Sequence, residues 1–421
     1  MKIALLSLVI CLLPTHLPAA VLSLDECLVQ VRSNNPALRT ARTDTQVATE
    51  MVTQSDASLY PRIDAQGGYT AQLEAQAMKV NGQTLETQQP SYAFAGLGVN
   101  YTLYDFGRRD ARRAAARGQL NVVQLGISQQ EQDTILQATQ TYLAILEAQQ
   151  NVAAGEDELK TVEAHLRVAQ ALYEAGSATR NDLLQAEVRR ATANQQLLAQ
   201  RNVVTNLYLR LNFLRGATAH ERPELLEPLM PSAPPQHAPD TSKALQKRPD
   251  LQALRKSMVI TEQDVRESKA AFYPELFARL SLDYLENSKL REQALYAGTI
   301  GLKVNLFDGF SSTAGKRKAM AAQIQAQERL RLAEEQTKLE IATARNDLAV
   351  AYQRIGVTKE AIRQGEENLR INRDRYQERV GTATEVLDAQ TLLTQSRTEH
   401  YRAIYDYQLA VARLRRATGE L

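Results

Sequence analysis

The sequence predicts a mainly α-helical protein with a smaller β-sheet part, built from two copies of one structural plan. Two very long segments carry apolar residues at every seventh position, which is typical of long helices that pack against other helices. Shorter segments of about ten residues alternate between apolar and polar side chains, which is typical of β-strands. The same series of motifs occurs twice, which indicates an internal duplication.

The composition excludes two classes of protein. The 421 residues include 50 Lys and Arg against 48 Asp and Glu, and the net charge of +2 lacks the basic field of a nucleic-acid-binding protein. Hydrophobic residues make up 44% and charged residues 23% of the chain, which is not the composition of a disordered protein. We therefore expect a folded protein with no nucleic-acid partner.

Residues 1–20 are predicted to be a signal peptide and not part of the fold. One lysine precedes an apolar run of 11 residues, which is too short to cross a bilayer as a helix. Small residues follow the run, and we expect cleavage after Ala19 or Ala20. Cys27 then remains as the single cysteine, so no disulfide can form within the mature chain. We expect Cys27 to be a half-buried helical side chain and not a lipid anchor.

Several motifs support the duplication. Asn35-Pro36-Ala37-Leu38 and Tyr60-Pro61 match Arg248-Pro249-Asp250-Leu251 and Tyr273-Pro274 at an offset of 213 residues. At an offset of 203 residues, two heptad series match, namely Ile145, Val152, Leu159, Leu166 and Tyr173 with Leu348, Ile355, Ile362, Leu369 and Tyr376. Chance is a poor explanation, because independent motifs keep the same order in both halves.

The predicted organisation is a signal peptide (1–20), a first repeat (21–215), a Pro-rich and irregular linker (216–240) and a second repeat (241–421). Each repeat begins with helices, continues with two strands and ends with a long helix hairpin. The first long helix of each hairpin covers about Gly107–Ala175 and Gly309–Arg379. At about 1.5 Å per residue, each would measure on the order of 100 Å.

The strand segments have the length of strands that cross a membrane. Pro274–Glu286 and Leu295–Leu306 alternate clearly, Leu97–Leu103 does the same, and Pro61–Tyr69 alternates more weakly. Each is close to the roughly ten residues that a tilted strand needs to cross a bilayer. The alternation alone is equally consistent with a soluble antiparallel sheet that has one buried face.

The distribution of aromatic residues favours the membrane. Residues 60–107 and 272–310 contain eight of the 16 Tyr and six of the seven Phe. Several of these rings stand at the ends of strand segments, where transmembrane barrels carry aromatic girdles. Together with the signal peptide, this distribution predicts strands that cross a membrane.

Four strands are too few to seal themselves in a membrane. An open sheet edge in hydrocarbon leaves backbone groups unpaired, at a cost of several kcal/mol for each group. About eight strands is the usual minimum for a closed barrel. We therefore expect identical chains to share one barrel, with eight strands in a dimer, twelve in a trimer and sixteen in a tetramer.

Short motifs follow one another in a fixed order in both halves. The first-half motifs are Asn34-Asn35-Pro36-x-Leu38, Tyr60-Pro61, Leu103-Tyr104-Asp105-Phe106-Gly107, Tyr173-x-x-Gly176 and Asp182-Leu183-Leu184-Gln185-Ala186. The second-half motifs are Arg248-Pro249-Asp250-Leu251, Tyr273-Pro274, Leu306-Phe307-Asp308-Gly309, Val380-Gly381-Thr382 and Glu385-Val386-Leu387-Asp388-Ala389-Gln390. This order resembles the TolC-like outer membrane factor family over essentially the whole mature chain.

The resemblance implies an outer membrane protein with a long periplasmic extension. It implies a homotrimer, in which four β-strands per protomer form a shared 12-stranded barrel and the helices form a long coiled-coil barrel. The implied function is a passive exit duct of a tripartite efflux or type I secretion system. The implied partners are outer membrane lipid, a periplasmic adaptor (membrane fusion protein) and an inner-membrane pump of the RND or ABC type.

The resemblance also implies functional residues near the ends of the helix hairpins. The adaptor would dock at the tips, at Gly176, Ser177, Val380, Gly381 and Thr382. Glu385 and Asp388 match an acidic periplasmic gate, and Asp182 and Tyr376 match a latch between the hairpins of one chain. Either Arg375 or Arg379 is a candidate for the cation of this latch.

The residues alone permit two interpretations of the acidic pair. In a trimer, three copies of Glu385 and Asp388 near one axis would repel one another, so the closed state would bind cations or protons. Alternatively, the two are ordinary acidic residues in the first turn of a helix, where the helix dipole favours negative charge.

No pattern predicts an enzyme, so we expect no catalytic residue, no cofactor and no metal site. The five His residues are scattered, and none is paired with Cys at metal-binding spacing. The segment from Gly309 to Arg317 is similar to a phosphate-binding loop, but its spacing is wrong and it lacks the Ser or Thr that holds magnesium.

Two basic clusters each follow a strand and open a long helix. They are Arg108-Arg109 with Arg112-Arg113, and Lys316-Arg317-Lys318. We expect them to lie just below the barrel on its periplasmic side. The alternative to a duct is a structural periplasmic coiled-coil protein with soluble sheets and no pore.

Overall fold

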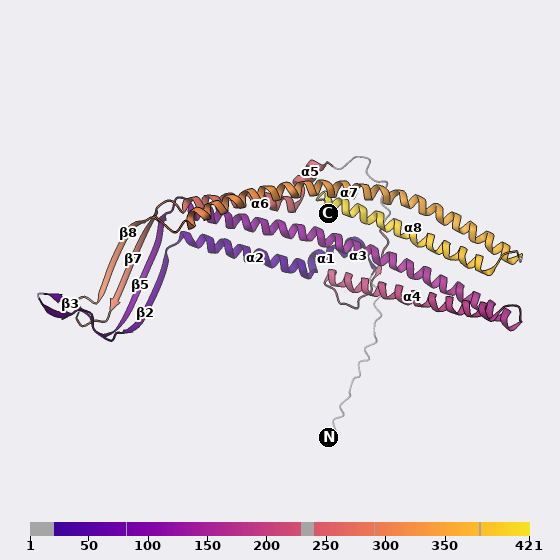
Figure 1. The fold of residues 1–421 in the computed structure, drawn as a ribbon, viewed down its shortest axis with the longest axis horizontal. Helices are drawn as coiled ribbons and strands as arrows, with labels where there is room; N and C mark the ends of the chain where they lie inside the picture. Colours follow the sequence, from indigo (N-terminus) through magenta and orange to yellow (C-terminus); the bar gives the residue numbers. More distant parts are fainter. Residues whose placement is uncertain (1–20, 81, 229–239, 290, 379) are drawn as a thin grey trace, which may run out of the picture. The chain divides into compact units, whose positions relative to one another are not determined.

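A computed structural model describes residues 21–80, 82–228, 240–289, 291–378 and 380–421, which form long helices and a smaller set of β-strands (Figure 1). The predicted signal peptide lies outside the described residues, as do residues 229–239 of the predicted linker. Within the described ranges, no helix is both long enough and apolar enough to span a membrane.

The chain divides into two compact units, and each unit takes residues from both halves of the sequence. The helical unit consists of the residues up to Arg39, Gln130–Ala244 and Lys338–Leu421. The sheet unit consists of Thr40–Gln129 and Leu245–Thr337. The two longest helices contribute residues to both units.

The helices follow the predicted plan. The longest, α3 (Arg108–Glu174) and α7 (Ser311–Gln377), contain 67 residues each, so the prediction of two very long helices is confirmed. The other helices are α1 (Leu24–Asn34), α2 (Pro36–Asp56), the 3-10 helix η1 (Ala57–Leu59), α4 (Arg180–Arg215), α5 (Thr241–Lys247), α6 (Pro249–Ala270) and α8 (Ala383–Ala417).

Local signals determine where several helices begin. Ser23, Thr179 and Thr382 each accept a hydrogen bond from the backbone N–H three residues ahead, and the acidic residue at that position bonds back to the cap. These reciprocal capping boxes satisfy backbone donors that the first turn of a helix leaves unpaired. Pro249 stands at the start of α6, where its fixed φ favours the helix and its missing N–H is not needed.

The core of the helical unit forms where α1, α3, α4 and α8 contribute apolar side chains. Tyr142 and Leu211 are fully buried there. The cluster also contains Leu22, Val31, Ala138, Leu143, Ile145, Leu146, Tyr208, Leu214, Leu225 and Tyr405. Cys27 is fully buried and not half-buried as predicted, because α1 places it inside this cluster, and burial raises the pKa of its thiol to about 11.

A short parallel strand pair closes this core, and the alternation pattern does not predict it. β1 (Val21–Leu22) pairs with β6 (Glu224–Leu225), which lies within the predicted linker. The hydroxyl oxygen of Tyr142 lies 2.8 Å from the backbone carbonyl oxygen of Leu22 and 2.7 Å from that of Leu226, and its one proton is shared between these two acceptors. Within the described part of the predicted linker, only Glu224–Leu225 form a strand, and the other residues of 216–228 lie in turns or in irregular structure.

A four-stranded antiparallel sheet lies in the sheet unit. Its strands are β2 (Arg62–Ala71), β5 (Ser91–Tyr104), β7 (Glu275–Leu285) and β8 (Ala294–Lys303), in the order β2-β5-β7-β8. The central pair joins one strand from each half of the chain, with Asn100 opposite Arg279. All four predicted strands are present, although β5 begins at Ser91 and not at Leu97. The hairpin of β3 (Ala77–Val80) and β4 (Gln83–Glu86) is absent from the prediction.

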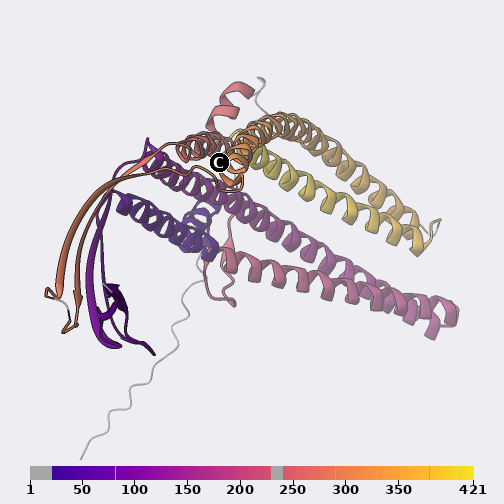
Figure 2. The same cartoon turned by 60° about the vertical axis from the view of Figure 1, so that its left-hand side comes forward.

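The sheet separates apolar from polar side chains but buries neither face. Leu280, Ile300 and Leu302 lie on the apolar face and are 60%, 76% and 71% exposed. Among the described residues, no side chain of the four strands is buried. Figures 1 and 2 show no helix across either face of the sheet. The sheet therefore lacks the buried face that a soluble antiparallel sheet requires.

Candidate functional site

The two helix hairpins end in tips whose described residues make backbone hydrogen bonds at equivalent positions. At the first tip, the N–H of Ser177 donates to the carbonyl of Leu172 at 2.8 Å. At the second tip, the N–H of Val380 donates to the carbonyl of Arg375 at 2.9 Å. The two bonds lie 203 positions apart, which is the offset of the heptad series. The duplication therefore extends to the turns that close the hairpins.

This equivalence explains why the tip glycines are spaced differently in the two halves. Gly381 donates to the carbonyl of Arg375 at 3.0 Å, as Ala178 donates to that of Leu172 at 3.2 Å. Gly381 therefore takes the position of Ala178. Gly176 has a φ of +69°, a left-handed conformation that favours glycine, whereas Gly381 is not among the residues with positive φ.

Two predicted site residues form the caps of the helices that leave the tips. The carboxylate of Asp182 accepts hydrogen bonds from the backbone N–H of Thr179 at 2.9 Å and from its hydroxyl at 2.7 Å. The hydroxyl of Thr179 holds the pKa of this carboxyl below its usual range. Likewise, the carboxylate of Glu385 accepts from the backbone N–H of Thr382 at 2.9 Å. Both acids thus stabilise the first turn of their own helix.

The structure brings some of the predicted gate and latch residues together. The guanidinium of Arg375 lies 3.9 Å from the carboxylate of Glu385 on the second tip, and Asp388 is exposed. Within the described part of the chain, no hydrogen bond joins Asp182 to Tyr376, which is 38% exposed. Arg379, the other candidate latch cation, lies outside the described residues.

A hydrogen bond that sequence reasoning missed joins the two hairpins. The guanidinium of Arg189 on α4 donates to the hydroxyl of Thr391 on α8 at 3.0 Å, and it lies 4.0 Å from the carboxylate of Glu158 on α3. Arg189 and Thr391 are 202 residues apart. No local pattern identifies such a pair, because only the packing of one hairpin beside the other brings it together.

At the base of the sheet, β5 and β8 each lead into a long helix through two left-handed residues. After β5 these are Phe106, with a φ of +54°, and Gly107, with a φ of +83°. After β8 they are Gly309 and Phe310, each with a φ of +67°. Glycine and phenylalanine thus exchange places between the two corners. A bulky residue such as phenylalanine rarely adopts a positive φ, because its side chain then clashes with the backbone, so the surrounding structure must stabilise this conformation.

The phenylalanines of these corners belong to a group of exposed aromatic rings. Phe106 stacks on Tyr273 with ring centroids 5.1 Å apart, and Phe307 contacts Phe310 edge-to-face at 5.6 Å. Tyr104, Phe106, Tyr273, Phe307 and Phe310 are 55%, 46%, 56%, 75% and 72% exposed. Exposed rings at the ends of strands are the arrangement that transmembrane barrels place at a membrane interface.

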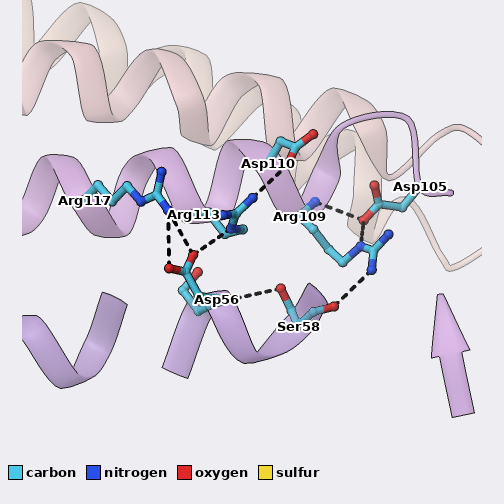
Figure 3. Close-up of polar contacts among 8 residues, drawn as sticks. Asp56, Ser58, Asp105, Arg109, Asp110, Arg113 and Arg117 are labelled. Carbon is cyan, nitrogen blue, oxygen red and sulfur yellow. Dashed lines mark hydrogen bonds and ion pairs between the residues drawn. The ribbon is translucent and has the colours of Figure 1, made fainter. Parts of the chain in front are cut away.

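A polar cluster ties the end of α2 to the beginning of α3 (Figure 3). The guanidinium of Arg109 donates to the carboxylate of Asp105 and to the carbonyl of Ser58, each at 3.0 Å. Arg113 pairs with Asp56 at 2.6 Å and holds the pKa of that carboxyl below its usual range. Two further ion pairs complete the cluster. Arg117 lies 3.3 Å from Asp56, and Asp110 lies 3.3 Å from Arg113.

The polar face of the sheet and the start of α3 line an open cleft of about 690 Å³. Six cationic side chains line this cleft, namely Arg62, Arg108, Arg109, Arg112, Arg279 and Lys303. Three acidic side chains also line it, namely Asp64, Asp105 and Glu275. The first basic cluster predicted from the sequence therefore contributes three of its members to a surface rich in positive charge.

The chain matches known proteins along most of its length. The family model described as outer membrane efflux protein matches residues 27–217 and 241–420. The outer membrane efflux protein BepC of Brucella suis biovar 1 is 23% identical over an alignment of 409 positions that covers 95% of this chain and 86% of BepC. The outer membrane protein TolC of Vibrio cholerae serotype O1 is 23% identical over an alignment of 420 positions that covers 95% of this chain and 91% of TolC.

Solved structures share the fold. CusC aligns with a TM-score of 0.80 and 18% identity over 94% of this chain and 92% of CusC. The outer membrane protein VceC of Vibrio cholerae aligns with a TM-score of 0.78 and 19% identity over 94% of this chain and 96% of VceC. Together with the uncovered sheet and the exposed rings, these matches establish that the chain is an outer membrane protein of the outer membrane efflux protein family.

Proposed function

We propose that three copies of the chain form a duct through the outer membrane and into the periplasm, which passively exports substrates. An inner-membrane pump and a periplasmic adaptor deliver these substrates to the duct. The observation that carries the proposal is the four-stranded sheet, whose apolar face is uncovered and whose order leaves β2 and β8 at its edges.

Closure of the sheet requires further copies of the chain. In hydrocarbon, each unpaired backbone group of an edge strand costs several kcal/mol. Pairing β8 of one chain with β2 of the next satisfies both edges and continues the alternation of faces around a ring. The apolar face then meets lipid and the polar face lines the lumen. The family resemblance favours the trimer, with twelve strands, among the closed rings that this pairing permits.

The hairpin tips are the proposed docking sites of the adaptor, at Gly176, Ser177, Val380, Gly381 and Thr382. Their equivalent backbones support this role, because one adaptor surface can recognise both tips of every chain. The alkaline protease secretion protein AprF of Pseudomonas aeruginosa is 23% identical over 69% of this chain. Its name, beside those of the efflux proteins, supports a duct that serves either efflux or secretion.

Glu385 and Asp388 are the proposed periplasmic gate. In the trimer, three copies of the exposed Asp388 carboxylate converge near the axis, while Arg375 partly neutralises Glu385. Asp182 and Tyr376 are the proposed latch, and the bond between Arg189 and Thr391 adds a second link between the hairpins. Crowded carboxylates favour cation binding, so divalent cations should block the closed duct.

Membrane fractionation tests the duct. We expect the protein in the outer membrane fraction, as a band on a gel that migrates as a trimer and becomes a monomer band on heating. A soluble, monomeric periplasmic protein would contradict the proposal and favour the structural coiled-coil alternative.

Conductance across a planar bilayer tests the gate. We expect Glu385→Ala combined with Asp388→Ala to weaken the block by divalent cations, because the variant removes the converging carboxylates. Glu328→Ala with Asp347→Ala, two exposed acids on α7 away from the tip, removes the same charge and should leave the block unchanged. Equal block in the parent and the gate variant would exclude these two residues as the gate.

A further inference from the structure

The cleft at the base of the sheet holds more positive charge than its acidic residues neutralise. Arg62 pairs with Asp64 at 2.8 Å, and Arg109 pairs with Asp105 at 3.0 Å. The remaining acid of the cleft, Glu275, accepts a hydrogen bond from the hydroxyl of Thr102 at 2.8 Å. Two of the three acids are therefore each matched to one specific arginine.

Three cations of the cleft remain without an acidic partner among the described residues: Arg108, Arg279 and Lys303. Arg279 donates to the neutral amide oxygen of Asn100 at 2.8 Å, which fixes its direction but leaves its charge. Arg108 and Arg279 are exposed, and so is Lys303. By contrast, Arg112 is used in an ion pair of 2.5 Å to Glu267 outside the cleft.

The register of the strands places Arg279 and Lys303 on one face of the sheet, and Arg108 lies at the start of α3. Arg62, Asn100 and Arg279 are aligned across β2, β5 and β7, and Glu275 stands opposite Lys303 across β7 and β8. Alternation assigns this face to the lumen of the proposed duct, opposite the face of Leu280 and Ile300. In a trimer, three copies of the cleft would surround one axis at the periplasmic end of the barrel.

We propose that Arg108, Arg279 and Lys303 form a cationic collar in the lumen, which binds phosphate and carboxylate groups of solutes that pass through the duct. This inference rests on the proposed duct, because it needs the polar face to line the lumen. A confined, like-charged surface with low-dielectric walls focuses the field and concentrates counter-ions. The charge that the collar favours is therefore opposite in sign to the charge that the acidic tips favour.

The experiment uses purified full-length protein in planar bilayers. The background carries Glu385→Gln and Asp388→Asn, which remove the negative charges of the two proposed gate residues. The collar variant is Arg108→Gln, Arg279→Gln, Lys303→Gln. The ratio of chloride to potassium permeability should fall by on the order of tenfold in about 0.1 M KCl. The difference should shrink in about 1 M KCl, where the Debye length falls to about 3 Å. Inorganic phosphate should reduce the current of the background channel but not that of the collar variant.

The matched control is Lys79→Gln, Lys160→Gln, Arg291→Gln, which removes the same charge at positions that do not line the cleft. It should retain the permeability ratio and the phosphate effect of the background. The single variant Arg108→Gln, on the helix and not in a strand, gives an intermediate shift if the triple variant assembles poorly. Channels with the same ratio and the same phosphate effect in all variants would overturn the collar alone. Failure of every variant and of the parent to conduct would overturn the duct and the collar together.

Discussion

The helical unit and the four-stranded sheet of this chain bury apolar side chains to very different extents. In the helical unit, Tyr142, Leu211 and Cys27 are fully buried in one cluster. In the sheet, no described side chain of the four strands is buried, and Ile300 is 76% exposed. The helical unit thus has a core of its own, whereas the sheet has an apolar surface with no cover in the single chain.

This difference shows which part of the fold depends on its surroundings. Burial of apolar area contributes about 25 cal/mol per Å², and the helical cluster gains it within one chain. In the proposed trimer, the sheet would gain it from lipid and from neighbouring copies. Substitutions in the two regions should therefore have different consequences. Those on the apolar face of the sheet should impair assembly in the membrane, and those in the helical core should lower the free energy of unfolding.

A charge on the apolar face of the sheet should have the largest effect. We expect Leu280→Lys to abolish most heat-resistant trimer in the outer membrane, because a lysine on the lipid face costs about 2–4 kcal/mol in every chain. Ser281→Lys, at the next position of the same strand, places the charge on the polar face and should assemble normally. Quantitative gels of unheated membranes measure the amount of trimer in both variants. An equal loss of trimer in the two variants would contradict the assignment of one face to lipid and the other to the lumen.

A cavity in the helical core should act on stability and not on membrane location. Leu211→Ala removes a fully buried side chain, so we expect the free energy of unfolding to fall by about 2–5 kcal/mol. Leu198→Ala on the same helix truncates a side chain that is 59% exposed and should cost much less. Denaturant unfolding of the detergent-solubilised protein, followed by circular dichroism, measures this. Similar losses in both variants would argue against the cluster as the core.

Loss of the Tyr142 hydroxyl, which bonds to Leu22 in β1 and to Leu226 after β6, should have a smaller effect on stability. Tyr142→Phe leaves the carbonyls of Leu22 and Leu226 without this donor, which should cost about 1–3 kcal/mol. Tyr173→Phe near the first tip, where the side chain is 40% exposed, is the control. Thermal unfolding of the two variants side by side gives the comparison. A Tyr142→Phe protein as stable as the control would show that the strand pair does not need the tyrosine.

The smallest expected effect is a change in pH dependence. Burial raises the pKa of Glu147 on α3 above the ordinary value of 4.5. The folded protein therefore binds this proton more tightly than the unfolded chain, so stability falls as the pH rises through the raised pKa. Glu147→Gln should be more stable than the parent at neutral pH and equally stable below pH 4.5. Unfolding curves at several pH values, with the exposed Glu187→Gln as control, test this sign.

Much of the fold could be predicted because its signals are local. Heptad series act over a few residues, and the predicted ranges Gly107–Ala175 and Gly309–Arg379 agree with α3 and α7 to within two residues. Alternation marked the four strands and their faces for the same reason. The strands β1 and β6 contain two residues each, too few for any periodicity to identify them.

Some features of the candidate sites could likewise be predicted from local motifs, and others could not. One interpretation of the sequence placed Glu385 and Asp388 in the first turn of a helix, and in the structure Glu385 lies in the first turn of α8 whereas Asp388 lies beyond it. The partners of Arg109 and Arg189 could not be predicted, because Ser58 and Thr391 are 51 and 202 residues away and meet them only through packing. The surplus of cations in the cleft likewise depends on which acids pair with which arginines.

The sequence by itself determined the long helices, the four long strands, the two faces of the sheet and the duplication, because each depends on side-chain periodicity or on short motifs. Only the tertiary structure decided that the central sheet pair joins the two halves and that the charges at its base form one cleft. Those features depend on contacts between segments far apart in the chain, and the free energy of such contacts is set by packing and not by local pattern.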